Sequence, residues 1–175
     1  PTRRSSDLEA TTEPEWLDRA EKMAAFAYKV ASKNGWRIPE YFDENWEANH
    51  EAGKLLNDGR RYYEGYVTGH SMQLARFALQ VRAGLRSMGW DVPDYLLEMG
   101  TELFERARVD GWRRTDACPG FSTGVDDEGD PIPGEDEHQQ WVVCEGVCAA
   151  VAVRRAMLDD GARVSEVEHF EHCYR

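Results

Sequence analysis

One stretch dominates this sequence, a turn that enters a long apolar helix: Tyr66-Val67-Thr68-Gly69-His70-Ser71-Met72-Gln73-Leu74-Ala75-Arg76. From there to Met88, apolar residues recur with a helical period on two neighbouring stripes, Leu74, Phe77, Ala78, Val81, Leu85 and Met88 on one and Met72, Ala75, Leu79 and Ala83 on the other. A helix that is apolar on two neighbouring stripes is covered over most of its surface. We therefore predict a buried helix over 70–88, entered through Thr68 and Gly69.

The first turn of this helix holds a histidine. His70 and Gln73 are three residues apart, which places them on one face at the N-terminal end of the helix. The positive end of the helix dipole disfavours an imidazolium, so we expect a neutral His70 that can accept a proton. A histidine in a first turn can also simply bond to nearby backbone, and this stretch alone leaves both roles open.

Four further helices are predicted, over 13–33, 93–110, 139–159 and from Val164 onward. Three of the five helices stop at a Gly-Trp pair: Gly35-Trp36, Gly89-Trp90 and Gly111-Trp112. Glycine supplies a left-handed residue after the last turn, and the tryptophan can fold back on that turn. This regularity predicts repeated helical hairpins.

Two connections interrupt the helices. The loop over 37–65 contains Pro39, Tyr41, Phe42 and Trp46, and a connection of this length is usually functional or packed under its own aromatic side chains. Residues 120–133 are expected to form a small β-hairpin with an acidic, glycine-containing turn.

The helix over 139–159 is apolar nearly all round, yet it carries Glu145 one turn after Trp141. An unpaired carboxylate on an apolar surface is costly. We therefore expect Glu145 to meet a partner or to face a polar cavity.

Composition and charge limit the classes of protein to which this chain can belong. The chain has 175 residues, 41% of them apolar, with six Trp, seven Tyr and six Phe, which is enough for one domain with one core. Its net charge of −12 argues against nucleic acid or an anionic membrane as a partner. The sequence has no apolar run long enough to span a bilayer and no signal-peptide pattern, so we expect a cytoplasmic protein.

We expect no metal site. None of the four cysteines forms a Cys-x-x-Cys pair, and Cys144 and Cys148 are interpreted as small buried thiols. The acidic run over 126–130 lacks an EF-hand pattern, because Pro131 stands where that loop needs glycine. The last potential metal ligands in the sequence are His169, His172 and Cys173. We interpret them as solvated side chains.

Four segments, in order, resemble the N-acylglucosamine 2-epimerase superfamily, most closely its mannose isomerase and sulfoquinovose isomerase branch. They are the segment over 36–46, Gly69-His70 with Ala75-Arg76, Gly111-Trp112 with Gly120-Phe121 and the hairpin through Pro133, and Trp141-Val142-Val143-Cys144-Glu145. The resemblance implies an all-α fold that is part of an (α/α)6 barrel, in which six helical hairpins surround a sugar pocket.

The resemblance also predicts the organisation of the chain. Residues 1–8 look like a translated sequencing adapter and are interpreted as a non-native leader. Residues 9–175 are then the middle-to-later portion of one barrel domain, truncated at both ends. We expect this piece alone to be inactive.

The chemistry implied by the resemblance is aldose–ketose isomerisation or C2 epimerisation of a free hexose or derivative, by proton transfer through an enediolate and without a cofactor. Such a reaction needs two acid/base groups and donors that hold the sugar oxygens. His70 matches one of two catalytic histidines, and the second would lie beyond Arg175. The pocket residues implied are Arg60, which approaches the substrate, Trp141 as an aromatic wall and Glu145 as a carboxylate.

Two positions depart from the family pattern. Gln73 stands at a catalytic position where the family has glutamate, and Gln140 replaces a histidine. An amide can hydrogen-bond to a sugar but cannot transfer a proton. The alternative is therefore a relative that has lost catalysis and binds carbohydrate. A hydrolase on a related barrel would need two facing carboxylates, and the sequence offers no convincing pair.

Overall fold

The computed structural model describes residues 14–49, 52, 65–113, 119–134 and 138–171. In these residues the helices are α2 (Pro14–Lys33), α4 (Thr68–Met88), α5 (Tyr95–Gly111), α6 (Gln140–Asp159) and α7 (Val164–Glu171). Each begins within two residues of the position predicted from the sequence. None of the described helices is long and apolar enough to cross a membrane.

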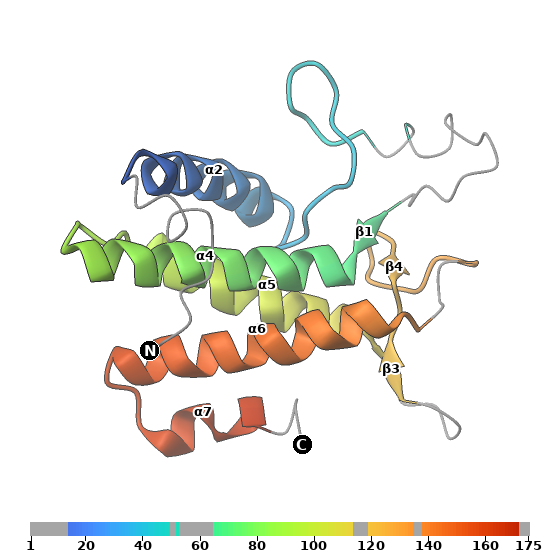
Figure 1. Ribbon diagram of the computed structural model, residues 1–175. Coiled ribbons are helices and arrows are strands. Elements are labelled where there is room, and N and C mark those ends of the chain that lie inside the picture. The colour runs from blue at the N-terminus through green and yellow to red at the C-terminus, as the bar shows by residue number, and fades with distance from the viewer. Residues whose placement is uncertain (1–13, 50–51, 53–64, 114–118, 135–137, 172–175) are drawn as a thin grey trace.

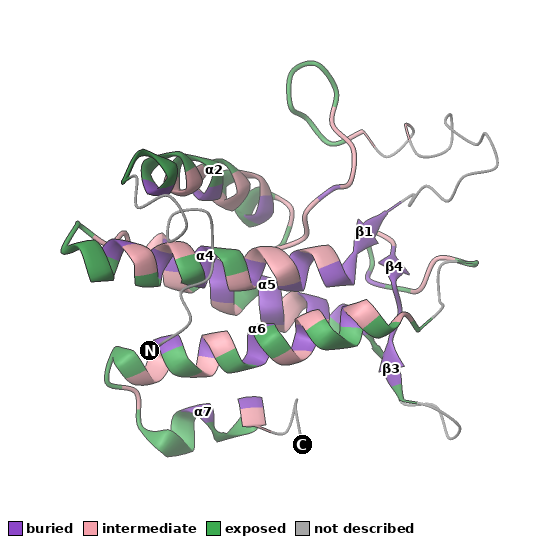
Figure 2. Cartoon of the chain, in the orientation of Figure 1, coloured by how far each residue is buried: buried purple, intermediate pink, exposed green. Residues whose placement is uncertain are grey.

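Helix α4 lies at the centre of the fold. It packs against α2, α5 and α6, and α7 adds to the outer side of α6 (Figure 1). The sides on which the helices meet are the buried ones (Figure 2). Residues that are fully or almost fully buried come from all these helices and include Ala31, Met72, Leu79, Leu103, Phe104, Val142, Val153 and Phe170.

The predicted burial of α4 is correct for most of one stripe and wrong for part of the other. Met72, Ala75 and Leu79 are buried and Ala83 is exposed. On the other stripe, Phe77 and Met88 are exposed. The Arg76 guanidinium lies 4.7 Å from the centre of the Phe77 ring, so a cation rather than another apolar side chain accompanies that ring.

Two of the three Gly-Trp pairs end their helices as predicted. Gly35 and Gly89 have φ angles of 60° and 68°, and the amides of Trp36 and Trp90 bond back to the carbonyls of Ala31 and Leu85, at 2.8 and 3.0 Å. The third pair also ends its helix, since α5 stops at Gly111 and Trp112 is its C-cap, but Gly111 is still helical and not left-handed as predicted. A Cβ atom there would lie 2.9 Å from Cγ2 of Thr68, so this glycine allows α5 to approach the start of α4.

Among the described residues, the strands form two short antiparallel pairs. β1 (Tyr66–Val67) pairs with β4 (Gly124–Val125), and β2 (Trp112–Arg113) pairs with β3 (Gly120–Phe121). The expected hairpin over 120–133 is reduced to the bridge between Val125 and Pro131, which closes the acidic turn. Its flanking strands pair mainly with segments next to α4 and α5, which fixes the N-terminal end of α4.

The loop after α2 is anchored at its base and packed on aromatic rings. Arg37 Nε donates to Asp110 Oδ2 at 2.7 Å, and Pro39 forms a β-bridge with Tyr66. Further along, the rings of Phe26, Phe42 and Trp46 contact one another. Of the two expectations for this loop, a function or packing on its own aromatic side chains, the contact between Phe42 and Trp46 supports the second for the described part.

Helices α4 and α6 run parallel to each other (Figure 1). Ion pairs join them at two levels along their length. Arg76 pairs with Glu145 near their N-termini, and Arg82 and Arg86 both pair with Asp160 just after α6. The paired charges fix the register of the two helices, so side chains from their first turns meet at one end of the molecule.

Candidate active site

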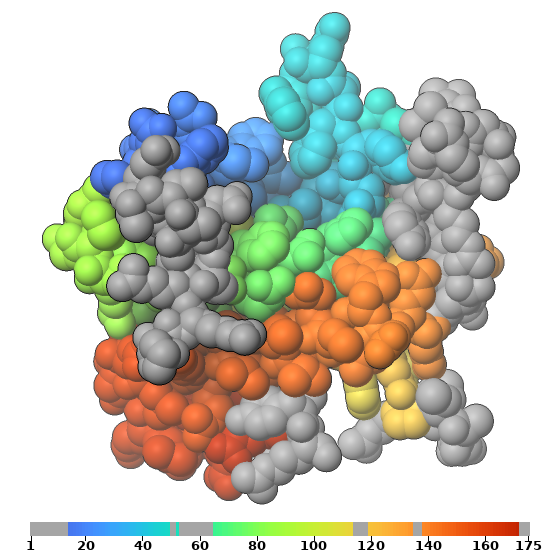
Figure 3. All heavy atoms as spheres, viewed as in Figure 1, coloured from blue at the N-terminus to red at the C-terminus, as the bar shows by residue number. Residues whose placement is uncertain are grey.

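The first turn of α4 is held by its neighbours on the β4 side. The Thr68 amide donates to the carbonyl of Thr123 at 3.0 Å, and its hydroxyl donates to the carbonyl of Ser122 at 2.7 Å. Val67, in extended conformation, precedes the helix, and no side chain caps it. These bonds fix the position from which His70 projects. The N-terminal half of α4 reaches the surface between the loop after α2 and α6 (Figure 3).

His70 is paired with a carboxylate from this loop. Nδ1 of His70 lies 3.0 Å from each carboxylate oxygen of Glu40, and Oε1 of Glu40 also accepts from the amide of Val67 at 3.3 Å. The His70 side chain is 41% exposed and that of Glu40 only 15%, so the histidine faces outward from a largely shielded partner.

The hydrogen bond to Glu40 raises the pKa of His70 above its ordinary value, although burial acts in the opposite direction. The expectation that the helix dipole keeps the imidazole neutral is therefore wrong in direction. A carboxylate in direct contact outweighs the partial charge of a helix end.

Trp141, in the first turn of α6, forms a wall beside this histidine. Its ring centre lies 5.3 Å from that of His70 at an angle of 40°, and its indole N–H donates to Gln139 Oε1 at 2.6 Å. A Cβ atom on Gly69 would lie 2.5 Å from the indole ring, so only glycine allows the indole to pack this closely on α4.

Glu145 has the partner that its apolar surroundings require. Arg76 donates through Nε and Nη2 to both of its carboxylate oxygens, at 2.9 to 3.1 Å. The amide of Gln73 also donates to Glu145, at 3.3 Å. The two members of this ion pair are about four-fifths shielded from solvent, which favours a fixed bidentate geometry.

The structure brings together four of the five predicted site residues: His70, Gln73, Trp141 and Glu145. Arg60 lies outside the described residues. Gln140 is exposed.

Sequence reasoning missed two members of the cluster, Glu40 and Arg76. Arg76 follows Gln73 by three residues, so its place next to Gln73 on α4 was readable from the helical spacing. Glu40 lies in a loop without periodicity, and only the segment shared with the family pointed to it.

The cluster offers acid/base chemistry rather than an evident metal centre. Among the described residues, no group of three His, Cys, Asp or Glu side chains could hold a metal ion. The cysteines of α6 differ from their prediction, since Cys144 and Cys148 are exposed free thiols and not buried. They lie on the side of α6 that α4 and α5 leave uncovered.

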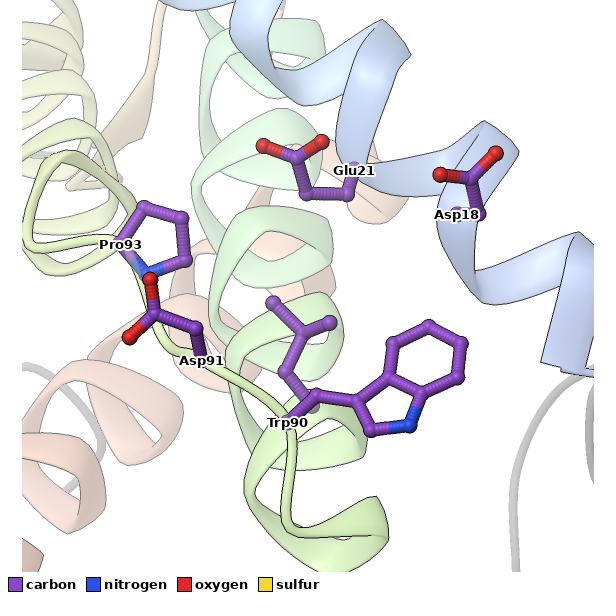
Figure 4. Close-up of a pocket in the computed structure, with 6 residues that line it drawn as sticks. Asp18, Glu21, Trp90, Asp91 and Pro93 are labelled. Atoms are coloured by element: carbon purple, nitrogen blue, oxygen red, sulfur yellow. The ribbon is translucent and has the colours of Figure 1, made fainter.

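A separate hollow lies at the other end of α4, lined by Asp18, Glu21, Leu85, Trp90, Asp91 and Pro93 (Figure 4). Leu85 follows His70 by four helical turns, or about 22 Å along the helix. None of the predicted site residues lines this hollow, so it is distinct from the His70 cluster.

Comparison with known proteins identifies relatives along nearly the whole chain. The sequence profile for N-acylglucosamine 2-epimerase (GlcNAc 2-epimerase) matches residues 7–170. A D-mannose isomerase from Thermobifida fusca is 31% identical over 171 residues, and one from Pseudomonas cannabina pv. alisalensis is 31% identical over 147 residues. These alignments cover 96% and 83% of this chain but only 38% and 34% of the relatives.

A solved structure supports the same fold. The crystal structure of a D-mannose isomerase superposes with a TM-score of 0.75 at 21% identity, covering 95% of this chain and 40% of that structure. The helical hairpins described above therefore share the fold of that isomerase, and they span less than half of its length.

Proposed function

Because the chain belongs to the N-acylglucosamine 2-epimerase family, we propose that its full-length gene product isomerises or epimerises a free hexose or hexose derivative. The observation that carries this proposal is the His70 cluster. A half-exposed histidine with a carboxylate partner stands beside an aromatic wall and a fixed Arg–Glu pair. Two relatives that carry the name D-mannose isomerase make mannose the first substrate to test.

In the proposed reaction, His70 removes a proton from a sugar carbon next to the carbonyl. The electron pair of the broken C–H bond forms an enediolate, and the proton returns to C1 for isomerisation or to C2 for epimerisation. A group that exchanges a proton in both directions works best with a pKa near the operating pH. The pKa of His70, raised from a value already near neutrality, suits that task.

The other residues of the cluster are assigned to substrate binding. Trp141 presents a ring face against which the apolar face of a sugar can stack. Glu145 already accepts bonds from Arg76 and Gln73, so the carbonyl oxygen of Gln73 is the acceptor that this amide offers to a sugar hydroxyl. We assign Arg60 to the same pocket from the resemblance alone.

One observation favours the alternative function, carbohydrate binding without turnover. Gln73 is bonded to Glu145, and an amide cannot carry the charge or transfer the proton of the glutamate that the family pattern has at this position. The partner of His70 in the family resemblance is a separate residue, a histidine expected beyond Arg175.

The test is conversion of mannose to fructose by the full-length gene product and by its His70→Ala variant. Loss of general acid–base catalysis should lower kcat by about 10²-fold or more. His169→Ala is the matched control, because His169 lies on α7 beside Glu105, away from the cluster, and should leave turnover unchanged. Mannose binding without turnover in the wild type would favour the alternative, and an unaffected His70→Ala enzyme would overturn the role of His70.

A further inference from the structure

Glu40 is held more firmly than a residue of an ordinary surface loop. Arg37, three residues earlier, donates to both carboxylate oxygens of Asp110, and its Nη1 donates to the carbonyl of Asp127 at 2.9 Å. Pro39 bridges to Tyr66, directly before α4. The backbone on the N-terminal side of Glu40 is therefore tied to three other segments.

The carboxylate of Glu40 then makes its contacts at one place, the start of α4. It accepts from the Val67 amide, and both of its oxygens lie 3.0 Å from Nδ1 of His70. A carboxylate only accepts hydrogen bonds, so the proton in this contact must belong to Nδ1. A neutral imidazole carries one N–H, which leaves Nε2 with the free lone pair.

No described residue competes for the remaining ring nitrogen. In the described part of the chain, Nε2 of His70 makes no hydrogen bond, while Trp141 lies against the ring. The ring is thus held from one nitrogen and from one side, and none of the described side chains bonds to the other nitrogen.

We propose that Glu40 is a positioning residue that holds His70 in the tautomer with its proton on Nδ1, so that Nε2 is the atom that exchanges a proton with the substrate. The role in turnover rests on the function proposed above. When Nε2 takes a proton from the sugar carbon, the sugar becomes an enediolate and His70 becomes an imidazolium, which the Glu40 carboxylate stabilises. Glu40 itself neither gains nor loses a proton in this step.

The first experiment reads the tautomer directly. In the full-length gene product with ¹⁵N-labelled histidine, His70 should show a protonated Nδ1 and an unprotonated Nε2 at a pH above its pKa. Glu40→Met removes the acceptor and should shift His70 toward the Nε2–H form. A wild-type protein with the proton on Nε2 would overturn the proposal, whatever its activity.

The second experiment measures the charge effect without turnover. Diethyl pyrocarbonate modifies only unprotonated imidazole, so the pH midpoint of His70 modification, followed by peptide mass spectrometry, reports its pKa. Glu40→Gln should move this midpoint to lower pH, because the neutral amide no longer favours the imidazolium. Glu44→Gln makes the same change at an exposed position of the same loop and should leave the midpoint in place. Equal midpoints in wild type and Glu40→Gln would contradict the proposal.

The third readout separates this proposal from the proposed function. In an active enzyme, Glu40→Gln should lower kcat on the order of 10²-fold and shift the acid limb of the kcat/KM profile to lower pH. If the wild type does not convert any hexose, the proposed function fails, but the tautomer and modification experiments still decide the role of Glu40. If the wild type is active and Glu40→Gln keeps its kcat and its pH profile, only the role of Glu40 fails.

Discussion

Gln73 lies between His70 and the ion pair of Arg76 with Glu145. It belongs to the same face of α4 as His70, and its amide donates to a carboxylate that Arg76 already neutralises. A glutamate at this position would place a second carboxylate about 3 Å from Glu145, with one guanidinium between them to offset the repulsion. Like charges this close raise the pKa of one of the two carboxyls.

We therefore expect Gln73→Glu to lower the free energy of unfolding at pH 7 by about 1 kcal/mol, through a lost hydrogen bond and added repulsion. The loss should shrink toward pH 5, where one carboxyl takes up a proton. Urea unfolding at the two pH values measures both effects. Gln80→Glu adds the same charge at an exposed position two turns further along α4 and should have little effect.

The same variant tests the alternative function. If the wild type binds mannose without turnover and Gln73→Glu converts it, the glutamine accounts for the loss of catalysis. If both turn it over, the amide is a tolerated part of the site.

At the residue level, the sequence predicted the members of the site better than their electrostatics. The cost of a carboxylate on an apolar helix correctly required a partner for Glu145, and Arg76 supplies it. The pKa direction of His70 could not be predicted, because it depends on Glu40, which is 30 residues away in the sequence and has no periodic signal.

Among the elements, the contact between α4 and α6 determines the shape of the site. Gly69 lies under the Trp141 indole, and no side chain fits between them. The distance between the first turns of these helices therefore sets how the indole stands beside His70.

Gly69→Ala should push the Trp141 ring away and raise KM for the sugar more than it lowers kcat. Overpacking at this contact should also cost about 1–3 kcal/mol of unfolding free energy. Gly89→Ala is the control: it introduces a left-handed alanine at φ 68° with no atom within 4 Å, so it should lose about 1 kcal/mol and keep KM. A Gly69→Ala enzyme with the KM of the wild type would show that the indole does not depend on this packing.

The elements themselves were largely readable from periodicity and helix-ending signals. The pairs at Gly35 and Gly89 obey the local rule because nothing else constrains these glycines. Gly111 does not follow this rule, because the start of α4 packs so close to it that a side chain would not fit. This is a tertiary contact, which no local sequence pattern contains. The strand pairings of the 120–133 segment escaped prediction for the same reason, since their partners are 7 to 59 residues away.

On the scale of the whole molecule, apolar side chains remain exposed on the outer face of α2. Met23 is 73% exposed, and Trp16 and Phe26 lie on the same side of the helix. A patch of this kind favours contact with other apolar surfaces. The chain spans 38% and 34% of the isomerases it aligns with, so most of the length of those relatives has no counterpart in it.

We predict that the 175-residue chain alone is inactive and self-associates through this patch. Size-exclusion chromatography with light scattering should show species larger than a monomer at micromolar concentration. Met23→Lys should reduce them, whereas Ser32→Lys adds the same charge on α2 outside the patch and should not. A monomer with a sharp cooperative melt would contradict this prediction.

The repeated hairpins were predictable at this scale because each helix carries its own period and ending signals. The placement of the site at one end of two parallel helices was not, because it depends on the ion pairs between α4 and α6 and not on either helix alone.

These ion pairs also impose an order on biosynthesis. Arg76, Arg82 and Arg86 are translated 69 to 78 residues before the carboxylates that they bind. A nascent chain that ends before Gln140 therefore contains His70 and its partner Glu40. The carboxylates that pair with the three arginines have not yet been synthesised. Trp141, Glu145 and Asp160 are thus synthesised together, within α6 and the residue after it, so this part of the site can form only after α6 is made.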